Sequence, residues 1–113
     1  MKQLLFLYII LSISACTQTT LSSDLLILDN IAYIKNHNTP FSGIVKSYHG
    51  NGHKKLMGTY IKGKRHGIWQ GWYAHGQKKF IHHYKEGKRF GEQLEYDENG
   101  KLIEGSNTTY YQL

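Results

Sequence analysis

The feature that most constrains this chain is a twenty-four-residue repeat that runs without gaps through most of its length. Three sets of residues keep this spacing: Gly43, Gly67 and Gly91; Gly52, Gly76 and Gly100; and Tyr48, Trp72 and Tyr96. The units span residues 41–64, 65–88 and 89–113, and the second half of the third unit departs from the pattern. A fixed period of this length predicts a repeat architecture, because one small unit cannot bury its apolar face alone and must stack on the next.

Each unit is expected to form a β-hairpin. Asn51-Gly52, His75-Gly76 and Asn99-Gly100 are flanked by aromatic and β-branched residues, which predicts two-residue type I′ turns. Residues 62–65 and 86–89 then join one hairpin to the next. The fold class predicted is all-β: an antiparallel meander of about seven strands, built from repeated hairpins in a single twisted open sheet. Its first strand is expected at Asn30–Lys35, pairing with the strand after Pro40.

Period-two alternation places one set of side chains on a common face of the expected sheet. The set is Ile44, Tyr48, Ile68, Trp72, Leu94 and Tyr96. Trp72 keeps the repeat register and is therefore the expected core residue. Trp69 lies three residues away, on the opposite face of a strand, and is expected to be an exposed anchor for a partner.

The N-terminal segment MKQLLFLYIILSISAC has a positive start, an apolar run and small residues before a cysteine, the layout of a secretory signal peptide over residues 1–15. The run is too short to span a bilayer. Ile13-Ser14-Ala15-Cys16 resembles the lipobox of bacterial lipoproteins, which implies cleavage before Cys16 and acylation of its sulfur and its new amino group. An ordinary signal peptide with an incidental cysteine, or an uncleaved anchor, is the alternative.

The remaining boundaries follow from this interpretation. Residues 16–29 are expected to form the lipidated cysteine and a flexible tether, and residues 30–113 the repeat domain. Cys16 is the only cysteine, so no internal disulfide can form. By the same resemblance, Thr17 after the cysteine favours the outer over the inner membrane of the cell envelope.

Charge is distributed unevenly. Residues 41–88 contain ten Lys or Arg and one acid, a net charge of +9, whereas residues 89–113 have a net charge of −3. Two sets of basic pairs recur at equivalent places and are expected to form basic ridges: Lys54, Lys55, Lys78 and Lys79; and Lys64, Arg65, Lys88 and Arg89. Such a surface can be simply solvated, can contact anionic lipid beside the anchor, or can bind an acidic protein with Trp69, Trp72 and Tyr73 as aromatic contacts. The export signal argues against nucleic acid.

The sequence offers little for catalysis, metals or cofactors. His82 and His83 are adjacent and point to opposite faces of a strand, while His49 and His53 straddle a turn without a clustered cysteine or carboxylate. Glu92 and Glu95 keep a small hydrolase open as a weak alternative, without a sequence signal for a cleft. We therefore expect a protein that is not an enzyme, with no metal and no cofactor.

The segment Lys62-Gly63-Lys64-Arg65-His66-Gly67-Ile68-Trp69 resembles the MORN repeat, and more closely the short bacterial variant of YwqK-type antitoxin-like proteins. The matching residues are Gly43, Tyr48, Asn51, Gly52, Gly67, Trp69, Tyr73, Gly76, Gly91, Tyr96, Asn99 and Gly100. Val45 and Gln93 stand where the tryptophan is expected. The resemblance implies a β-hairpin scaffold and a non-catalytic envelope lipoprotein that binds a protein partner, with an antitoxin or immunity role as one form. The alternative is a lipid-contacting or envelope-organising protein.

Overall fold

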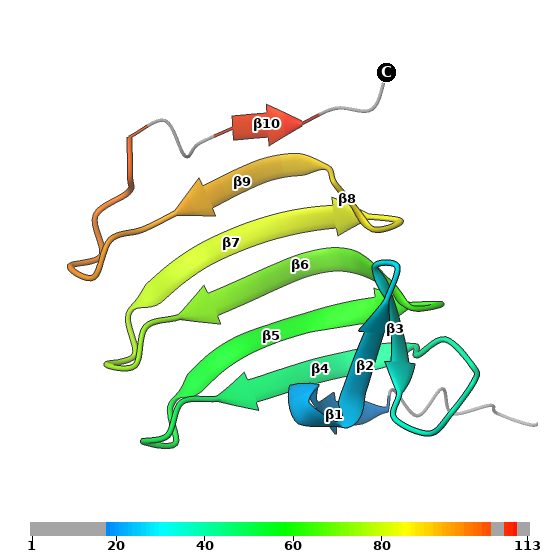
Figure 1. The fold of residues 1–113 in the computed structure, drawn as a ribbon. Helices are drawn as coiled ribbons and strands as arrows, with labels where there is room; N and C mark the ends of the chain where they lie inside the picture. The colour runs from blue at the N-terminus through cyan, green and yellow to red at the C-terminus, as the bar shows by residue number, and fades with distance from the viewer. Residues whose placement is uncertain (1–17, 105–107, 111–113) are drawn as a thin grey trace, which may run out of the picture.

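The computed structural model describes residues 18–104 and 108–110, so the lipobox and Cys16 lie outside the described residues. The described chain is built almost entirely from strands (Figure 1). The elements are β1 (Thr19–Leu21), η1, a 3-10 helix (Ser22–Asp24), β2 (Leu25–Leu28), β3 (Ile31–Ile34), β4 (Gly43–Tyr48), β5 (Lys54–Ile61), β6 (Lys64–Trp72), β7 (Lys78–Lys85), β8 (Lys88–Arg89), β9 (Gly91–Glu95) and β10 (Thr108–Tyr110). In this part of the chain, no helix is long and apolar enough to cross a membrane.

The main sheet has the order β1-β4-β5-β6-β7-β9-β10, and β8 also pairs with β7. β4, β5, β6 and β7 each pair antiparallel with the next strand in the chain, and β7 then pairs antiparallel with β9, which gives the long curved ladder of Figure 1. β1 differs, because it pairs parallel with β4 and so forms one edge of the sheet. The structure therefore confirms the prediction of an all-β fold of repeated antiparallel hairpins in an open sheet.

A second, two-stranded sheet was not predicted. β3 pairs with β2 along its whole length, from Leu25↔Ile34 to Leu28↔Ile31. Toward Pro40 and the next residue it makes only the isolated bridge Tyr33↔Pro40 and the bond from Phe41 N–H to Ala32 O, and it forms no ladder with β4. The predicted pairing of Asn30–Lys35 is thus wrong. Asp29 and Asn30 both have positive φ (49° and 63°), as a type I′ turn requires, and this turn folds β3 back on β2 instead.

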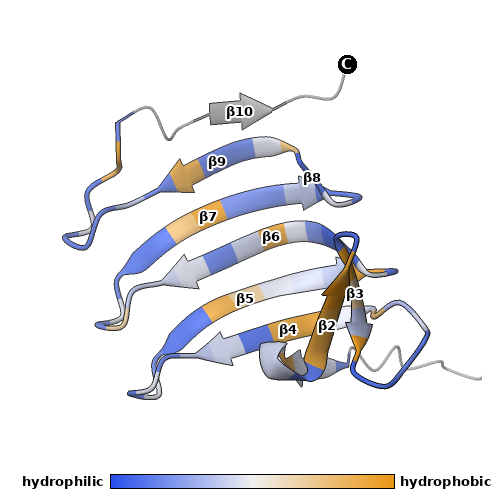
Figure 2. Ribbon diagram, viewed as in Figure 1, coloured by the Kyte–Doolittle hydropathy of each residue, from blue (hydrophilic) through white to orange (hydrophobic). Residues whose placement is uncertain are grey.

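The flexible tether predicted for residues 16–29 does not hold for the residues of it that the structure describes. Thr19–Leu21 form β1 against β4, and the apolar run Leu25–Leu28 forms β2. Both segments satisfy backbone hydrogen bonds in a ladder, which a flexible tether would leave to water. Figure 2 shows β2 as a strongly hydrophobic strand lying across the main sheet.

The two classes of turn are also assigned differently from the prediction. The loops after β4 and β6 have three residues, because His49 N–H donates to His53 O and Gly52 N–H donates to His49 O, with the same pattern one repeat later. Only the last residue of each loop has positive φ, which is 87° at Gly52 and 98° at Gly76. This is the type I turn followed by a left-handed glycine. The two-residue type I′ turns lie at the other end, at Lys62-Gly63 and Glu86-Gly87.

The core lies on the sheet face covered by the β2–β3 hairpin. Its buried members are Ala32, Phe41, Val45, Tyr60 and Trp69. Trp69 is 2% exposed, so its prediction as a surface anchor is wrong, and so is the choice of Trp72 for the core. The predicted common face exists, but it is the outer one: Ile68 is 52% and Tyr48 is 48% exposed. Both faces of each strand follow the repeat period, and the covering hairpin decides which face is buried.

Glycines make room for the large rings of this core. A Cβ placed on Gly58 would lie 2.1 Å from the Trp69 ring, and one on Gly71 would lie 2.2 Å from the Phe80 ring. Both distances are far below van der Waals contact. Trp69 therefore lies directly over the backbone of the preceding unit, and Phe80 lies over the neighbouring strand of its own unit.

Side chains of each three-residue loop also bond to the next loop, with the repeat period. His49 Nε2 donates to Trp72 O (2.7 Å), and Tyr73 Oη donates to Tyr96 O (2.8 Å) in the equivalent place. Asn51 Nδ2 donates to Ala74 O (2.7 Å), and its equivalent His75 Nε2 donates to Glu98 O (2.8 Å). These bonds link successive loops to one another at one end of the strands.

Candidate functional site

The most distinctive surface lies on the outer face, where Trp72 is flanked by two lysines. Lys78 Nζ lies 4.3 Å and Lys54 Nζ 5.8 Å from the Trp72 ring centroid. We call Lys54, Trp72 and Lys78 the outer cationic surface. The strand register places Trp72 opposite Lys78, and Tyr48 opposite Lys54 in the preceding hairpin, so repetition itself builds this arrangement.

The electrostatics of this surface are unbalanced. Partial burial, followed by the nearby charge of Lys54, lowers the pKa of Lys78. Lys78 Nζ donates to Gln70 Oε1, a neutral acceptor. Within the described residues, no carboxylate lies at ion-pair distance from either lysine of the surface. A hollow of about 240 Å³ beside Trp72 is lined by His53, Lys54, Trp72 and Gly76. The surface can therefore attract a negatively charged group without first breaking an internal ion pair.

Lys55 and Lys79, predicted to share this ridge, occupy a different position. Each is the extra residue of a register shift, opposite Ser47/Tyr48 and Gly71/Trp72 respectively, as in a β-bulge. Lys79 Nζ lies 5.5 Å from the ring centroid of Tyr73, the other predicted contact residue. Lys54 and Lys78 therefore lie together at Trp72, whereas Lys55 and Lys79 are the extra residues at the two register shifts.

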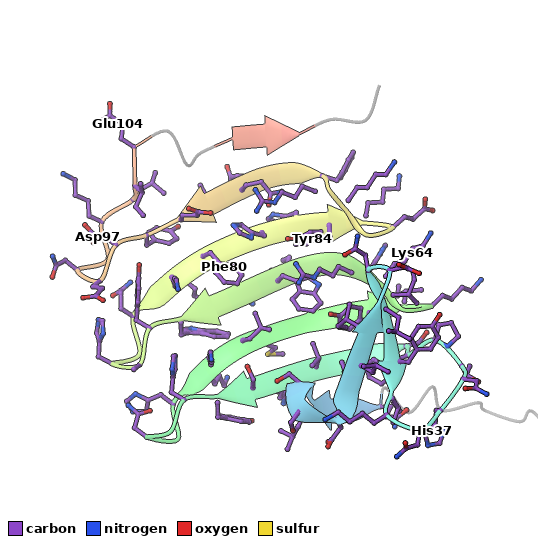
Figure 3. The ribbon with its side chains drawn as sticks, in the orientation of Figure 1. His37, Lys64, Phe80, Tyr84, Asp97 and Glu104 are labelled. Atoms are coloured by element: carbon purple, nitrogen blue, oxygen red, sulfur yellow. The ribbon has the colours of Figure 1, made fainter. Side chains whose placement is uncertain are left out.

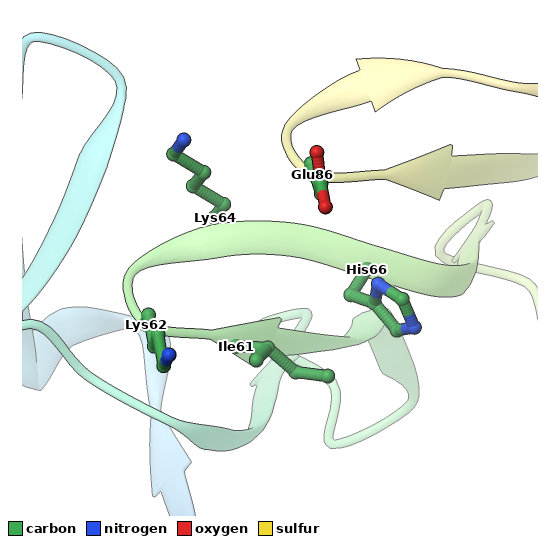
Figure 4. Close-up of a pocket in the computed structure, with 5 residues that line it drawn as sticks. All are labelled: Ile61, Lys62, Lys64, His66 and Glu86. Carbon is green, nitrogen blue, oxygen red and sulfur yellow. The ribbon is translucent and has the colours of Figure 1, made fainter.

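The second predicted ridge is also divided between the faces. Lys64 pairs with Ile61 while the next residue, Arg65, pairs with the core residue Tyr60. The next pair is divided in the same way, because Lys88 pairs with Lys85 and Arg89 pairs with Tyr84. Lys64 lines a hollow of about 300 Å³ beside the type I′ turns (Figure 4), with Ile61, Lys62, His66 and Glu86. Arg65 lies instead against the aromatic core.

Arg65 is held by aromatic rings on the core side. Its Cζ is 4.8 Å from the Trp69 centroid and 5.3 Å from the Tyr84 centroid, and Nη1 donates to Tyr84 Oη at 3.1 Å. Burial lowers the pKa of Arg65, but hydrogen bonds with the Tyr84 and Tyr60 hydroxyls outweigh it, and the net pKa is raised. The guanidinium is therefore a fixed positive charge.

Most of the histidines form hydrogen bonds through their rings. His82 is 8% exposed, stacks on Phe80 and lies 3.3 Å from Glu95 Oε1. Burial, and then the charge of Arg89, lowers the pKa of His82 despite the opposing effect of Glu95. His53 Nδ1 contacts Ala74 O, and His83 Nδ1 contacts Glu92 O. Among the residues that the structure describes, no group of three or more His, Cys, Asp or Glu is placed to hold a metal ion.

Sequence reasoning missed two features of these sites. The separation of Lys54 from Lys55 depends on the bulges, for which the sequence carries no simple signal. The loop-to-loop bonds could have been found, because His49 and Tyr73, and likewise Asn51 and His75, are donors spaced by the repeat period.

The repeat also matches a known family. A family model for the MORN repeat variant matches residues 41–62, 65–86 and 91–107, which together make up more than half of the chain. These segments correspond to the three predicted units and to the hairpins from β4 to β9. No curated protein and no solved structure matches the chain. The chain belongs to the MORN repeat variant family.

Proposed function

We propose that this protein is a non-catalytic binding module, held at a membrane of the cell envelope by lipid on Cys16, whose repeat sheet binds an acidic protein partner. The observation that carries this proposal is the outer cationic surface. Lys54 and Lys78 flank a partly exposed tryptophan without a carboxylate at ion-pair distance among the described residues. A partly exposed tryptophan is typical of the residues that dominate protein interfaces, and the two lysines beside it add charge complementarity to an acidic partner.

The lipid anchor is supported by the signal-peptide layout before Cys16 and by the resemblance to the lipobox. Several acyl chains would hold the module at the membrane surface without a spanning helix. Thr17 favours the outer membrane. Changing Cys16→Ser should move the protein from the membrane fraction to a soluble fraction, or leave it as an uncleaved precursor. Unchanged mass and unchanged membrane association would contradict lipidation.

An immunity role is one concrete form of the proposal. A tethered module could neutralise a toxin by covering its active surface, which needs affinity and no chemistry of its own. This form is supported by the resemblance of the units to YwqK-type antitoxin-like proteins. A gene for a toxin beside the gene for this chain would favour it.

The proposal is tested by affinity purification of the full-length protein from detergent-solubilised envelope, beside a variant with Lys54, Lys55, Lys78 and Lys79 changed to Glu. We expect one stoichiometric protein with the wild type and its loss with the variant. The same yield of that protein from both baits would contradict binding through the basic residues.

The alternative function is contact with the membrane itself or organisation of the envelope. The net charge of +9 over residues 41–88 favours it, since basic residues near anionic lipid each contribute about 1 kcal/mol. Recovery of lipid alone from both baits would support this alternative over a protein partner.

A further inference from the structure

A second cationic position lies on the opposite side of the sheet from the outer cationic surface. We propose that Arg65 binds a carboxylate side chain, in the hollow between the tip of the β2–β3 hairpin and strands β6 and β7. The proposal deepens the proposed function. It rests on that function in one respect, namely that the carboxylate belongs to a protein partner.

The hollow is formed where the hairpin meets the main sheet. It has a volume of about 260 Å³ and is lined by Ile27, Asn30, Tyr60, Arg65, Tyr84 and Gly87. Tyr84 lies on β7 near the tip of the hairpin (Figure 3). The Arg65 guanidinium is oriented by two rings and one hydroxyl, through its contacts with Trp69 and Tyr84. The group is therefore pre-organised, which reduces the entropy lost when a ligand binds.

Packing alone does not explain an arginine at this position. Phe41 occupies the equivalent place in the first unit and packs edge-on against Tyr60, with centroids 6.2 Å apart. An apolar ring thus satisfies the same part of the core. Arg65 adds five N–H donors, and the Tyr84 hydroxyl accepts from one of its nitrogens. In the described part of the chain, no carboxylate lies at ion-pair distance from Arg65.

A carboxylate fits this hollow better than other ligand classes. The planar guanidinium can present two parallel N–H groups, which match the two oxygens of a carboxylate. Asn30 and the tyrosine hydroxyls add neutral donors around the same space. The register places Arg89 opposite Tyr84, so a second positive charge lies on the same side of the sheet. An acidic side chain of a partner is therefore complementary to the hollow in both charge and size.

The test is a titration of the full-length, isotope-labelled protein in neutral detergent micelles, followed by NMR at the Arg65 Nε–H and Trp69 Nε1–H signals. The probe is N-acetylglutamate methylamide, which carries one side-chain carboxylate, and its control is N-acetylglutamine methylamide. We expect saturable shifts with the glutamate probe only. Arg65→Lys, which keeps the charge but loses the planar fork, should weaken binding at least about tenfold, as read from Trp69.

Lys64→Gln is the matched control, because Lys64 is the neighbouring residue but points to the other face. It should bind the probe as the wild type does. Equal binding by Arg65→Lys and wild type, or equal weakening by Arg65→Lys and Lys64→Gln, would overturn the site. At least tenfold tighter binding of inorganic phosphate at the same signals would overturn its assignment to carboxylates. Failure here leaves the affinity purification unaffected, since the lysines tested there lie elsewhere on the sheet.

Discussion

Trp69 is buried between Tyr60 and Tyr84, with ring centroids 4.9 Å and 6.2 Å away, whereas Trp72 lies between two lysines on the outer face. The third unit has Gln93 in the place of Trp69, and Gln93 is also buried, at 2% exposed. Its amide donates to His83 O at 2.9 Å and accepts from His83 N–H at 3.3 Å. Pairing with the backbone thus allows a polar residue to replace the ring at the end of the stack.

A substitution at Gly58 tests whether the Trp69 ring packs on the backbone there. The change Gly58→Ala places a methyl group where the Trp69 ring now lies, so we expect the free energy of unfolding to fall by about 1–3 kcal/mol. Urea denaturation of the full-length protein in detergent measures the difference. Gly50→Ala is the control, because nothing lies within 4 Å of its Cβ position, and it should change stability by less than about 0.5 kcal/mol. Equal effects of the two changes would show that Trp69 does not lie over Gly58.

His82 predicts a dependence of stability on pH. Burial and then Arg89 lower its pKa in the folded protein, so the unfolded chain takes up the proton first as the pH falls below about 6.5. The free energy of unfolding should therefore be highest above that pH, fall below it, and level off once the folded protein is also protonated.

The variant His82→Gln isolates this effect. Its free energy of unfolding should fall less than that of the wild type between about pH 8 and about pH 5, because one group with different folded and unfolded pKa values is gone. His37→Gln, which also removes a histidine but at an exposed position, is the control variant. An unchanged slope in His82→Gln would contradict the lowered pKa.

At the scale of the elements, the sheet is a stack of hairpins linked at both ends. The type I′ turns are joined by backbone bonds, as Gly63 N–H donates to Phe41 O (2.7 Å) and Gly87 N–H to Arg65 O (2.9 Å). The three-residue loops are joined by side chains, from His49 and Tyr73 to the next loop. The donors thus belong to the later residue at the type I′ turns and to the earlier residue at the three-residue loops, so neighbouring hairpins are bonded to each other at both ends.

The hydrogen bond from Tyr73 to Tyr96 O should make a measurable contribution to the free energy of unfolding. Tyr73→Phe keeps the ring but leaves Tyr96 O without its donor, and should lower the free energy of unfolding by about 0.5–1.5 kcal/mol. Tyr48→Phe is the control, because it makes the same chemical change at a tyrosine that is 48% exposed, and it should lower the free energy of unfolding by less. Denaturant titration of both variants decides the point. A Tyr48→Phe cost as large as that of Tyr73→Phe would argue against the loop linkage.

The sequence was sufficient to predict the strands from β4 to β9 and their order, because every unit carries the same turn glycines and alternating strands. It was not sufficient to predict which face is buried, since Trp69 and Trp72 lie in the same repeat unit, on opposite faces of one strand. The β2–β3 hairpin decides that question, and it lies before the repeat. The bulges at Lys55 and Lys79 likewise depend on how neighbouring strands meet, so the predicted ridges divided in the structure.

At the scale of the whole molecule, the open sheet offers two chemically different faces. The outer face carries the outer cationic surface, and the core-side face carries Arg65 beside the covering hairpin. Tethering through Cys16 would hold both close to a membrane and raise their effective concentration for a partner there. The central claim of this account is that the outer cationic surface, rather than net positive charge, binds that partner.

The most direct measurement is affinity purification from solubilised envelope with two double variants of equal charge. Lys54→Glu with Lys78→Glu alters the pair on Trp72, and Lys55→Glu with Lys79→Glu alters the pair at the bulges. We predict that the first variant loses a stoichiometric protein partner that the second retains. Equal recovery by both variants, or equal loss from both, would contradict the claim.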